Sequence, residues 1–203
     1  ITQGVWVSPD GVDESLTTGT EQDPFKTIDY SMSRSYATES DPITINLFEE
    51  TYAPSTTGEE FPIVMISNIN LIGQGEEVTI IDVDETARVI IMDNCQNNII
   101  SDLTIANGLA EGESSNRGGG MALSFSNPIL HHVTIADNHA YNGGGMALYF
   151  SNPILNHLTI TGNTATASGG ILLYHSNPTL NNVIITNNTV MGDGEWEGYG
   201  GGM

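Results

Sequence analysis

The histidines are the side chains of this sequence best suited to bind a transition metal. His132 and His157 are 25 residues apart, and Asp102 and Asn182 occupy equivalent positions before and after them. Imidazole nitrogens and carboxylate oxygens are ligands of Zn²⁺ and related ions, so His132 and His157 are candidate ligands. The alternative is that this position is a chain corner that accepts any polar residue, as the series Asp, His, His, Asn also indicates.

Two loops each hold three carboxylates close together in the sequence and are candidate calcium sites. The candidate ligands are Asp10, Asp13 and Glu14 in the first loop and Asp193, Glu195 and Glu197 in the second. Carboxylates at nearby positions converge on Ca²⁺ when a loop curls around the ion. Neither loop has the spacing of an EF-hand or of a glycine-rich calcium nonapeptide. Beyond a transition metal at the histidines, Ca²⁺ is the one cofactor that the sequence favours.

Four aromatic residues near the C-terminal end are candidates for glycan binding. Tyr149 and Tyr174 are 25 residues apart, and Trp196 and Tyr199 lie in a short insertion after them. Exposed aromatic rings on a rigid face stack on sugar rings. The alternative is that outward-facing tyrosines are common on strands and bind no ligand.

The charge of the chain limits its partners. The 203 residues include 25 Asp and Glu but 4 Lys and Arg, which gives a net charge of −21. Such a surface repels phosphates and anionic lipids, so we expect no nucleic acid partner. No apolar run is long enough to cross a membrane, and we expect no membrane insertion. Acidity also keeps extracellular proteins soluble, which is the alternative to a calcium-binding role.

A repeat of 25 residues positions these side chains. Residues 118–142, 143–167 and 168–192 align without gaps. Apolar residues alternate with polar ones, as at Met121 and Leu123, which predicts strands with one buried face. Each unit is too short to bury that face alone, so the units must stack as coils of parallel strands. The predicted fold is all-β, a right-handed parallel β-helix (a solenoid) with about 25 residues per coil.

Stacking places identical residues of successive units above one another. Two columns of asparagine are expected to form structural ladders with hydrogen bonds along the axis. The columns are Asn127, Asn152 and Asn177, and Asn138, Asn163 and Asn188. A proline after the first column fixes a corner. The glycine runs that open the units are expected to supply positive φ at another corner.

Residues 1–42 are predicted to form an N-terminal cap on a β-helix that takes up residues 43–203. Asp23 and Pro24 predict the N-cap and first position of a short amphipathic capping helix. Its apolar face, which would cover the first coil, is expected to contain Phe25, Ile28, Met32 and Tyr36. Strands are expected in the irregular early coils at 43–47, 63–66, 70–72, 78–81 and 89–92.

The sequence stops inside a repeat, without a capping element. Bare parallel strands at such an edge pair readily with other chains. We therefore expect a fragment of a longer protein that is open at its C-terminal edge. A glycan, another protein or a second copy joined end to end is the expected occupant of that edge.

Two stretches carry a resemblance to known proteins. The opening VWVSPDGVDESLTTGTEQDPFKTI resembles the first segment of many secreted bacterial β-helix proteins of the pectate-lyase-like superfamily. The units with GGGM, SNPIL, VTI and Asn resemble the repeats of bacterial surface proteins and are similar to those of chlamydial polymorphic outer-membrane proteins. The resemblance implies secretion with removal of a signal peptide, and an extracellular or cell-surface location.

The resemblance allows a scaffold or an enzyme. Lyases of this fold generally use Lys or Arg to abstract a proton, but residues 118–203 contain neither. The repeat also singles out no pair of carboxylates for a glycosidase. We therefore expect a non-catalytic scaffold with a structural, adhesive or glycan-binding role. The alternative is the N-terminal part of a polysaccharide-active enzyme, a lyase or glycoside hydrolase, whose site lies outside or at the edge of this chain.

Overall fold

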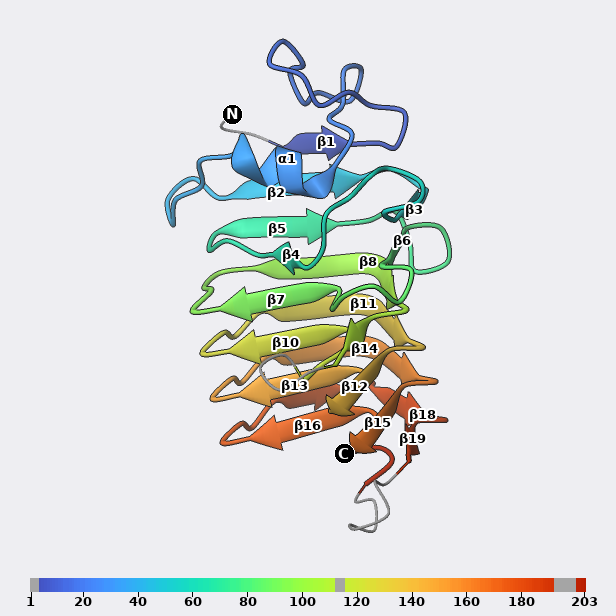
Figure 1. Cartoon of the computed structure of the whole chain (residues 1–203). Helices are drawn as coiled ribbons and strands as arrows, with labels where there is room; N and C mark the ends of the chain where they lie inside the picture. Colours follow the sequence, from blue (N-terminus) through green and yellow to red (C-terminus); the bar gives the residue numbers. More distant parts are fainter. Residues whose placement is uncertain (1–3, 112–115, 192–199) are drawn as a thin grey trace.

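The computed structural model describes residues 4–111, 116–191 and 200–203. Its strands wind into coils that stack along one axis, with the N-terminal segment at one end (Figure 1). Between the named strands of the described residues, every pairing is parallel. The predicted all-β parallel β-helix is therefore confirmed.

Three sheets run along the coil. The first sheet contains, in order, β1 (Val5–Val7), β2 (Ile43–Leu47), β5 (Ile69–Ile72), β8 (Ile99–Ala106), β11 (Ile129–Ala136), β14 (Ile154–Thr161) and β17 (Thr179–Asn181), with β3 (Thr51–Tyr52), β6 (Ile80–Asp82) and β18 (Ile184–Thr186) beside this path. The second sheet contains β4 (Ile63–Val64), β7 (Ile90–Asp93), β10 (Met121–Ser124), β13 (Met146–Tyr149) and β16 (Ile171–Tyr174). The third sheet contains β9 (Leu109–Ala110), β12 (His139–Asn142), β15 (Thr164–Ala167) and β19 (Thr189–Val190).

The strand register follows the repeat in the sequence. Met121 of β10 pairs with Met146 of β13, which pairs with Ile171 of β16, so one coil takes 25 residues. The preceding coil is longer, because Ile90 of β7 pairs with Met121, which lies 31 residues further along the chain. Most of the extra residues lie between β9 and β10.

Alternation along the strands separates a buried face from an accessible one. In β2 every second residue is buried, starting with Ile43. Inward side chains of successive coils form columns, such as Ile105, Ile135 and Ile160, which have no exposed surface. Each side chain covers the next, and burial of one such residue stabilises the fold by about 1.5–3 kcal/mol. Of the five early strands that we expected, the first has its expected bounds and the other four differ by one or two residues at one or both ends.

The two asparagine columns lie in different surroundings. Asn138, Asn163 and Asn188 form an inner ladder, in which Nδ2 of each donates to Oδ1 of the next at 2.9 Å. In the outer ladder the backbone N–H of Asn152 donates to Asn127 Oδ1 at 2.6 Å, and Asn177 makes the same contact with Asn152. The inner ladder therefore links side chains inside the coil, whereas the outer ladder links side chains to backbone at the surface.

The glycine runs have only part of the backbone conformation that we expected. Gly118 has positive φ, at 63°, but Gly119 and Gly120 do not. Gly120 is required by packing, because a β-carbon there would lie 2.7 Å from the carbonyl oxygen of Gly145 in the next coil. The expectation of positive φ is wrong for these later glycines, which instead allow adjacent coils to approach closely.

The N-terminal helix is shorter than the sequence indicates. α1 (Ile28–Ser33) begins after Thr27, whose Oγ1 accepts a hydrogen bond from the backbone N–H of Tyr30 at 3.2 Å. Met32 packs into the core, but Tyr36 lies beyond the helix and is exposed. The apolar face of the helix therefore does not contain Tyr36.

The expected start of this helix is also wrong. The carboxylate of Asp23 accepts hydrogen bonds from the backbone N–H and the hydroxyl of Thr18, both at 2.8 Å, and does not cap the helix. Pro24 and Phe25 precede the helix, and the backbone N–H of Phe25 donates to the carbonyl of Trp6. The chain stays extended here because Phe25 is held beside β1.

The segment before residue 42 contributes directly to the first sheet. β1 pairs with β2 along its whole length, and α1 contacts β1, β2 and β4. Figure 1 shows this segment at the end of the stack. The division into a cap at 1–42 and a β-helix at 43–203 stays a prediction.

Candidate functional site

The outer face of the second sheet is hollowed into a groove of about 660 Å³, which we call the sheet groove. Its floor contains Ile91, Ala122 and Ala147, which are in register on β7, β10 and β13. Two of these three side chains are alanine, which is short, so the bottom of the groove lies close to the backbone of the strands. A hollow of this volume accommodates a small ligand or part of a polymer.

Two arginines line the sheet groove where β7 and β10 begin. The guanidinium of Arg88 donates to the carbonyl oxygens of Arg117, at 2.6 and 3.0 Å, and of Gly118, at 2.8 Å. Burial lowers the pKa of Arg88, but a guanidinium keeps its proton in proteins. Arg88 therefore holds the segment that carries Arg117, and both cations line the groove.

Polar and aromatic side chains line the groove where these strands end. Asp93, Ser124, Tyr149 and Tyr174 are paired in register on neighbouring strands. The rings of Tyr149 and Tyr174 are stacked, with centroids 4.8 Å apart and an interplanar angle of 4°. Their faces therefore contact each other, and their edges and hydroxyl groups remain for a ligand. Neither hydroxyl has a hydrogen-bond partner among the described residues.

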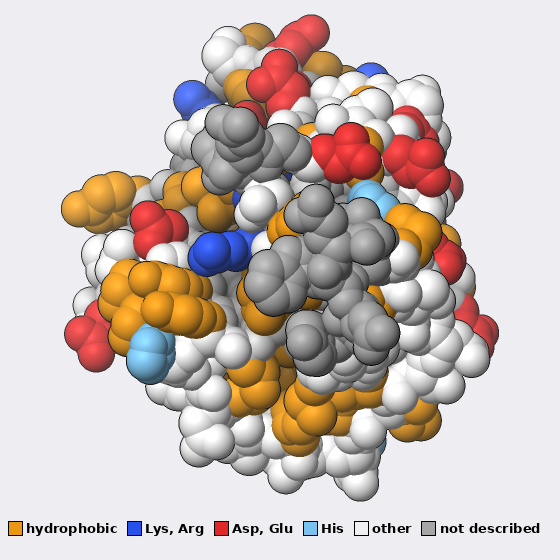
Figure 2. Space-filling model, turned by 60° about the horizontal axis from the view of Figure 1, so that its bottom comes forward, with side chains coloured by type: hydrophobic (Ala, Val, Ile, Leu, Met, Phe, Trp, Pro, Cys, Tyr) orange, Lys and Arg blue, Asp and Glu red, His pale blue; other side chains and the backbone are white. Residues whose placement is uncertain are grey.

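A second aromatic column flanks the tyrosines. Phe125, Phe150 and His175 directly follow β10, β13 and β16, and their rings stack at centroid distances of 5.2 and 4.8 Å. All three have positive φ, at 48°, 47° and 49°. Bulky residues rarely adopt this conformation, and in the coil before them the position is occupied by Asn94. Figure 2 shows exposed hydrophobic side chains gathered into a patch with a histidine at its margin.

The structure brings together half of the predicted glycan-binding set. Tyr149 and Tyr174 lie side by side in the sheet groove, whereas Trp196 and Tyr199 lie outside the described residues. Our sequence reasoning missed the second aromatic column, although its 25-residue spacing is the signal that identified the tyrosines. It also missed both arginines of the groove, because the coil that carries them departs from the 25-residue period.

Asp13, one of the three candidate calcium ligands of the first loop, is hydrogen-bonded within the chain. The carboxylate of Asp13 accepts hydrogen bonds from the backbone N–H of Lys26, at 2.7 Å, and from the hydroxyl of Thr27, at 2.6 Å. Asp13 therefore holds the segment that leads into α1, while Asp10 and Glu14 are exposed. Calcium binding here stays a prediction. The second set of candidates, Asp193, Glu195 and Glu197, lies outside the described residues.

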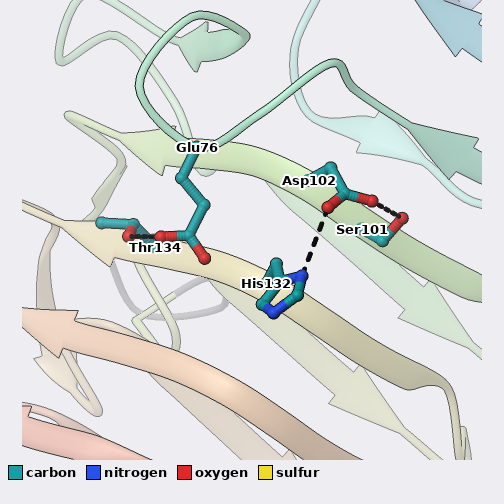
Figure 3. A network of polar contacts seen from close by, with 5 residues as sticks. All are labelled: Glu76, Ser101, Asp102, His132 and Thr134. Atoms are coloured by element: carbon teal, nitrogen blue, oxygen red, sulfur yellow. Dashed lines mark hydrogen bonds and ion pairs between the residues drawn. The ribbon is translucent and has the colours of Figure 1, made fainter.

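The candidate transition-metal ligands lie in a polar column on the outer face of the first sheet. Asp102, His132, His157 and Asn182 occupy equivalent positions in four coils, and all have positive φ. His132 Nδ1 lies 3.5 Å from Asp102 Oδ1, and His157 Nε2 lies 3.1 Å from Asn182 Nδ2. Figure 3 shows Asp102 between His132 and Ser101, whose hydroxyl donates to the carboxylate at 2.6 Å. The column is therefore present, and its binding of a metal stays a prediction.

Two protein families match the sequence. The family described as "Right handed beta helix region" matches residues 67–201. A family described as a protein of unknown function, DUF1565, matches residues 10–80. No curated protein matches the chain. In the described residues, no helix is long and apolar enough to cross a membrane.

Solved structures show the same fold. Pectin methylesterase PemA from Erwinia chrysanthemi superposes with a TM-score of 0.50 and 11% sequence identity, over 86% of this chain and 60% of that one. A pectin methylesterase mutant in complex with a hexasaccharide gives a TM-score of 0.50 at 12% identity, with the same coverage. The chain thus spans 60% of the length of these proteins. At this identity the likeness establishes the fold alone, a right-handed parallel β-helix.

Proposed function

Because the chain belongs to the right-handed β-helix family, we propose that it is an extracellular or cell-surface scaffold that binds a polysaccharide in the sheet groove. The binding is non-catalytic in this proposal. The observation that carries it is the placement of Tyr149 and Tyr174 in the same groove as Arg88 and Arg117.

The groove offers the chemical groups that a polysaccharide needs. Sugars present hydroxyl groups, which donate and accept hydrogen bonds, and apolar C–H faces. Hydrogen-bond donors are available from the hydroxyls of Tyr149 and Tyr174 and from the guanidinium of Arg117. The carboxylate of Asp93 is an acceptor. The low floor formed by Ala122 and Ala147 leaves room for a sugar chain across the strands.

The two arginines favour a polysaccharide that bears carboxylate groups. Arg88 and Arg117 are two of only 4 basic residues in the chain, and both line this groove. A guanidinium binds a carboxylate through charge-assisted hydrogen bonds. The net charge of −21 opposes the approach of a strongly anionic polymer, so a partly esterified polymer fits this surface better than a fully charged one.

A single carboxylate among the described residues of the groove favours binding over glycoside hydrolysis. Hydrolysis of a glycosidic bond generally needs two carboxyl groups about 5–10 Å apart. Asp93 is the one carboxylate among the described residues that line the sheet groove. It is exposed and accepts a hydrogen bond from Asn94 at 3.0 Å.

An enzyme that acts on pectin is the second candidate function. The specific observation in its favour is that Asp93 lines the same groove as Arg88 and Arg117. The solved structures that share the fold are named pectin methylesterases, and this chain spans 60% of their length. In this alternative the chain is the N-terminal part of a polysaccharide-active enzyme.

Isothermal titration calorimetry with hexasaccharides tests the binding proposal. The probes are oligogalacturonate, its methyl ester and a neutral oligosaccharide of equal length. We expect saturable binding that weakens at least about tenfold in Tyr174→Ala and in Arg117→Ala. The matched controls are Tyr141→Ala, an exposed tyrosine on β12, and Arg34→Ala, an exposed arginine after α1. Binding by none of the three probes, or equal losses in the controls, would contradict the proposal.

Product assays with the same probes separate binding from catalysis. Release of methanol from the methyl ester, or of new reducing ends from any probe, supports the enzyme alternative if Asp93→Asn abolishes it. We expect no release by the native chain under conditions in which binding is saturated.

A further inference from the structure

We propose that His131, His132 and His157 form a binding site for a transition-metal ion, such as Zn²⁺, on the outer face of the first sheet. The site is separate from the sheet groove, and it does not depend on the function proposed above. His131 extends the pair of histidines that the sequence singles out to a set of three.

The three histidines are the best-placed metal ligands in the described part of the chain. One ligand atom from each lies within 4.8 Å of the other two, and no other group of three His, Cys, Asp or Glu side chains in those residues meets this condition. The ring centroids of His131 and His132 are 4.0 Å apart, and those of His132 and His157 are 5.0 Å apart. Three of the five histidines in the chain therefore converge on one point.

Binding requires only a small movement of these side chains. Zinc–nitrogen bonds are about 2.0–2.1 Å long, so nitrogens around one tetrahedral ion lie about 3.3 Å apart. The rings of His132 and His157 are exposed and that of His131 is half-buried, so each has room to rotate. The backbone that carries them belongs to β11 and β14, which are paired in register and hold the three residues in place.

Asp102 supplies the carboxylate that metal-binding histidines generally contact through the ring nitrogen that does not bind the metal. Its Oδ1 lies 3.5 Å from Nδ1 of His132 (Figure 3). A carboxylate at Nδ1 favours the tautomer with the proton on that nitrogen, which leaves the lone pair of Nε2 for the metal. The hydroxyl of Ser101 donates to Oδ2 of the same carboxylate and orients it.

The contact between Asn182 and His157 has to change if the metal binds through Nε2 of His157. The amide Nδ2 of Asn182 lies 3.1 Å from this nitrogen, which is one of the two nitrogens of the ring that can bind a metal. Asn182 is exposed, so its side chain is free to turn away. Three imidazoles then leave a fourth coordination position for water or for a small ligand.

The polar-corner alternative explains only part of this arrangement. Left-handed backbone favours Asn, Asp and His, which accounts for the residue types at His132 and His157. It does not account for His131, which lies within the strand where neighbouring coils have Ser101 and Asn156. The proposed metal site requires all three histidines. The negative net charge of the protein also raises the local concentration of cations.

Calorimetric titration of the native chain with ZnCl₂ tests the site. We expect one Zn²⁺ per chain and a higher melting temperature in its presence. His132→Ala and His157→Ala are expected to weaken binding at least about 100-fold, and Asp102→Asn about 10- to 100-fold. The matched control is His139→Ala, which removes a histidine on β12 that lies 3.8 Å from Glu111 and outside the cluster. Substitution by Co²⁺ should give the visible absorption of a tetrahedral site in the native chain and not in His132→Ala.

Two outcomes would overturn the proposal. One is the absence of saturable Zn²⁺ uptake by the native chain. The other is uptake that is equal in the native chain, His132→Ala and His157→Ala, which would assign the binding to the acidic surface. Circular dichroism of each variant shows whether the coil is intact, so that a loss of binding is not confused with unfolding.

Discussion

The interior and the exterior of the same coils use one stacking geometry in different ways. Inside, the amide of Asn163 exchanges hydrogen bonds with Asn138 and Asn188 and is shielded from water. Outside, Tyr149 and Tyr174 stack with equal regularity, but their hydroxyl groups have no partner in the described residues. The interior amide of Asn163 is therefore satisfied within the chain, whereas the two exterior hydroxyl groups are available to a ligand.

This difference separates structural columns from candidate functional ones. Both kinds recur every 25 residues, so repetition does not distinguish them. The two kinds of column differ in solvent accessibility and in whether their polar groups have hydrogen-bond partners. A buried group without a partner would destabilise the fold, whereas an exposed one can bind water or a ligand. Substitutions inside should consequently change stability, and substitutions outside should change binding.

The largest effect is expected for Asn163→Ala, in the middle of the inner ladder. The amide of Asn163 donates to the carbonyl oxygens of Ile135 and Thr161 at 2.9 and 3.0 Å, and its Oδ1 accepts from the amide of Asn138 at 2.9 Å. Removal leaves several buried groups unpaired, and we expect the free energy of unfolding to fall by about 3–5 kcal/mol. Urea denaturation measures this loss.

Asn152→Ala in the outer ladder is the matched control for Asn163→Ala. Asn152 is exposed, so groups that lose its side chain can bind water instead. The expected loss is about 1 kcal/mol or less. Equal losses in the two variants would break the distinction between interior and exterior.

The second-largest expected effect is on the pH dependence of stability and comes from Glu59. This carboxylate is buried, whereas most acidic side chains of the described residues are exposed. Glu59 accepts hydrogen bonds from the backbone N–H groups of Ile28, at 2.7 Å, and Asp29, at 2.9 Å, at the start of α1. Burial nevertheless raises the pKa of Glu59 from 4.5 to about 7. Between these values the folded protein holds a proton that the unfolded chain has released. The free energy of unfolding is therefore highest at the acid end of this range and falls by at most about 3 kcal/mol as the pH rises to about 7.

Urea denaturation at several pH values measures this dependence. Glu59→Gln should abolish the contribution of this group, because the amide does not titrate. Glu60→Gln, at the exposed neighbouring residue, should keep it. If the native protein and Glu59→Gln have parallel stability profiles from pH 4.5 to 7, the decline comes from general repulsion among the surface carboxylates.

The smallest effect on stability is expected for Phe150→Asn in the exterior aromatic column. The substitution removes the ring contacts of Phe150 within the column and with the two tyrosines beside it, which contribute about 1–2 kcal/mol. It also removes a bulky side chain from a left-handed backbone position, which relieves about 1 kcal/mol. We expect a net change below about 1 kcal/mol in thermal or urea unfolding, because the two effects offset each other. A loss of several kcal/mol would make this column a structural element.

The repeat determined how much of the fold could be predicted. Met121, Met146 and Ile171 are 25 residues apart and pair in register, so the alternation of one unit predicted the buried face of the others. The start of α1 could not be predicted in this way. Asp23 and Pro24 have the residue types of a helix start, but the pairing of Phe25 beside β1 is a tertiary contact that overrides this local preference.

The candidate sites were predictable only where they followed the period. Tyr149, Tyr174, His132 and His157 lie in columns and were identified from spacing alone. Arg88 and Arg117 come together through the hydrogen bonds that the Arg88 guanidinium donates to the carbonyl oxygen of Arg117, and no spacing rule indicates such a contact. His131 was overlooked because its equivalents in neighbouring coils are not histidine.

Equal coils also determine how the row of side chains along the sheet groove can be extended. Adjacent strands lie about 4.8 Å apart, so duplication of one 25-residue unit would lengthen the row of groove side chains by one step of that size. Each position of the duplicated unit would keep its neighbour on one side and gain a copy of itself on the other. A chain of this kind can therefore evolve a longer groove by copying a segment of its own gene, without redesign of the contacts that it already has.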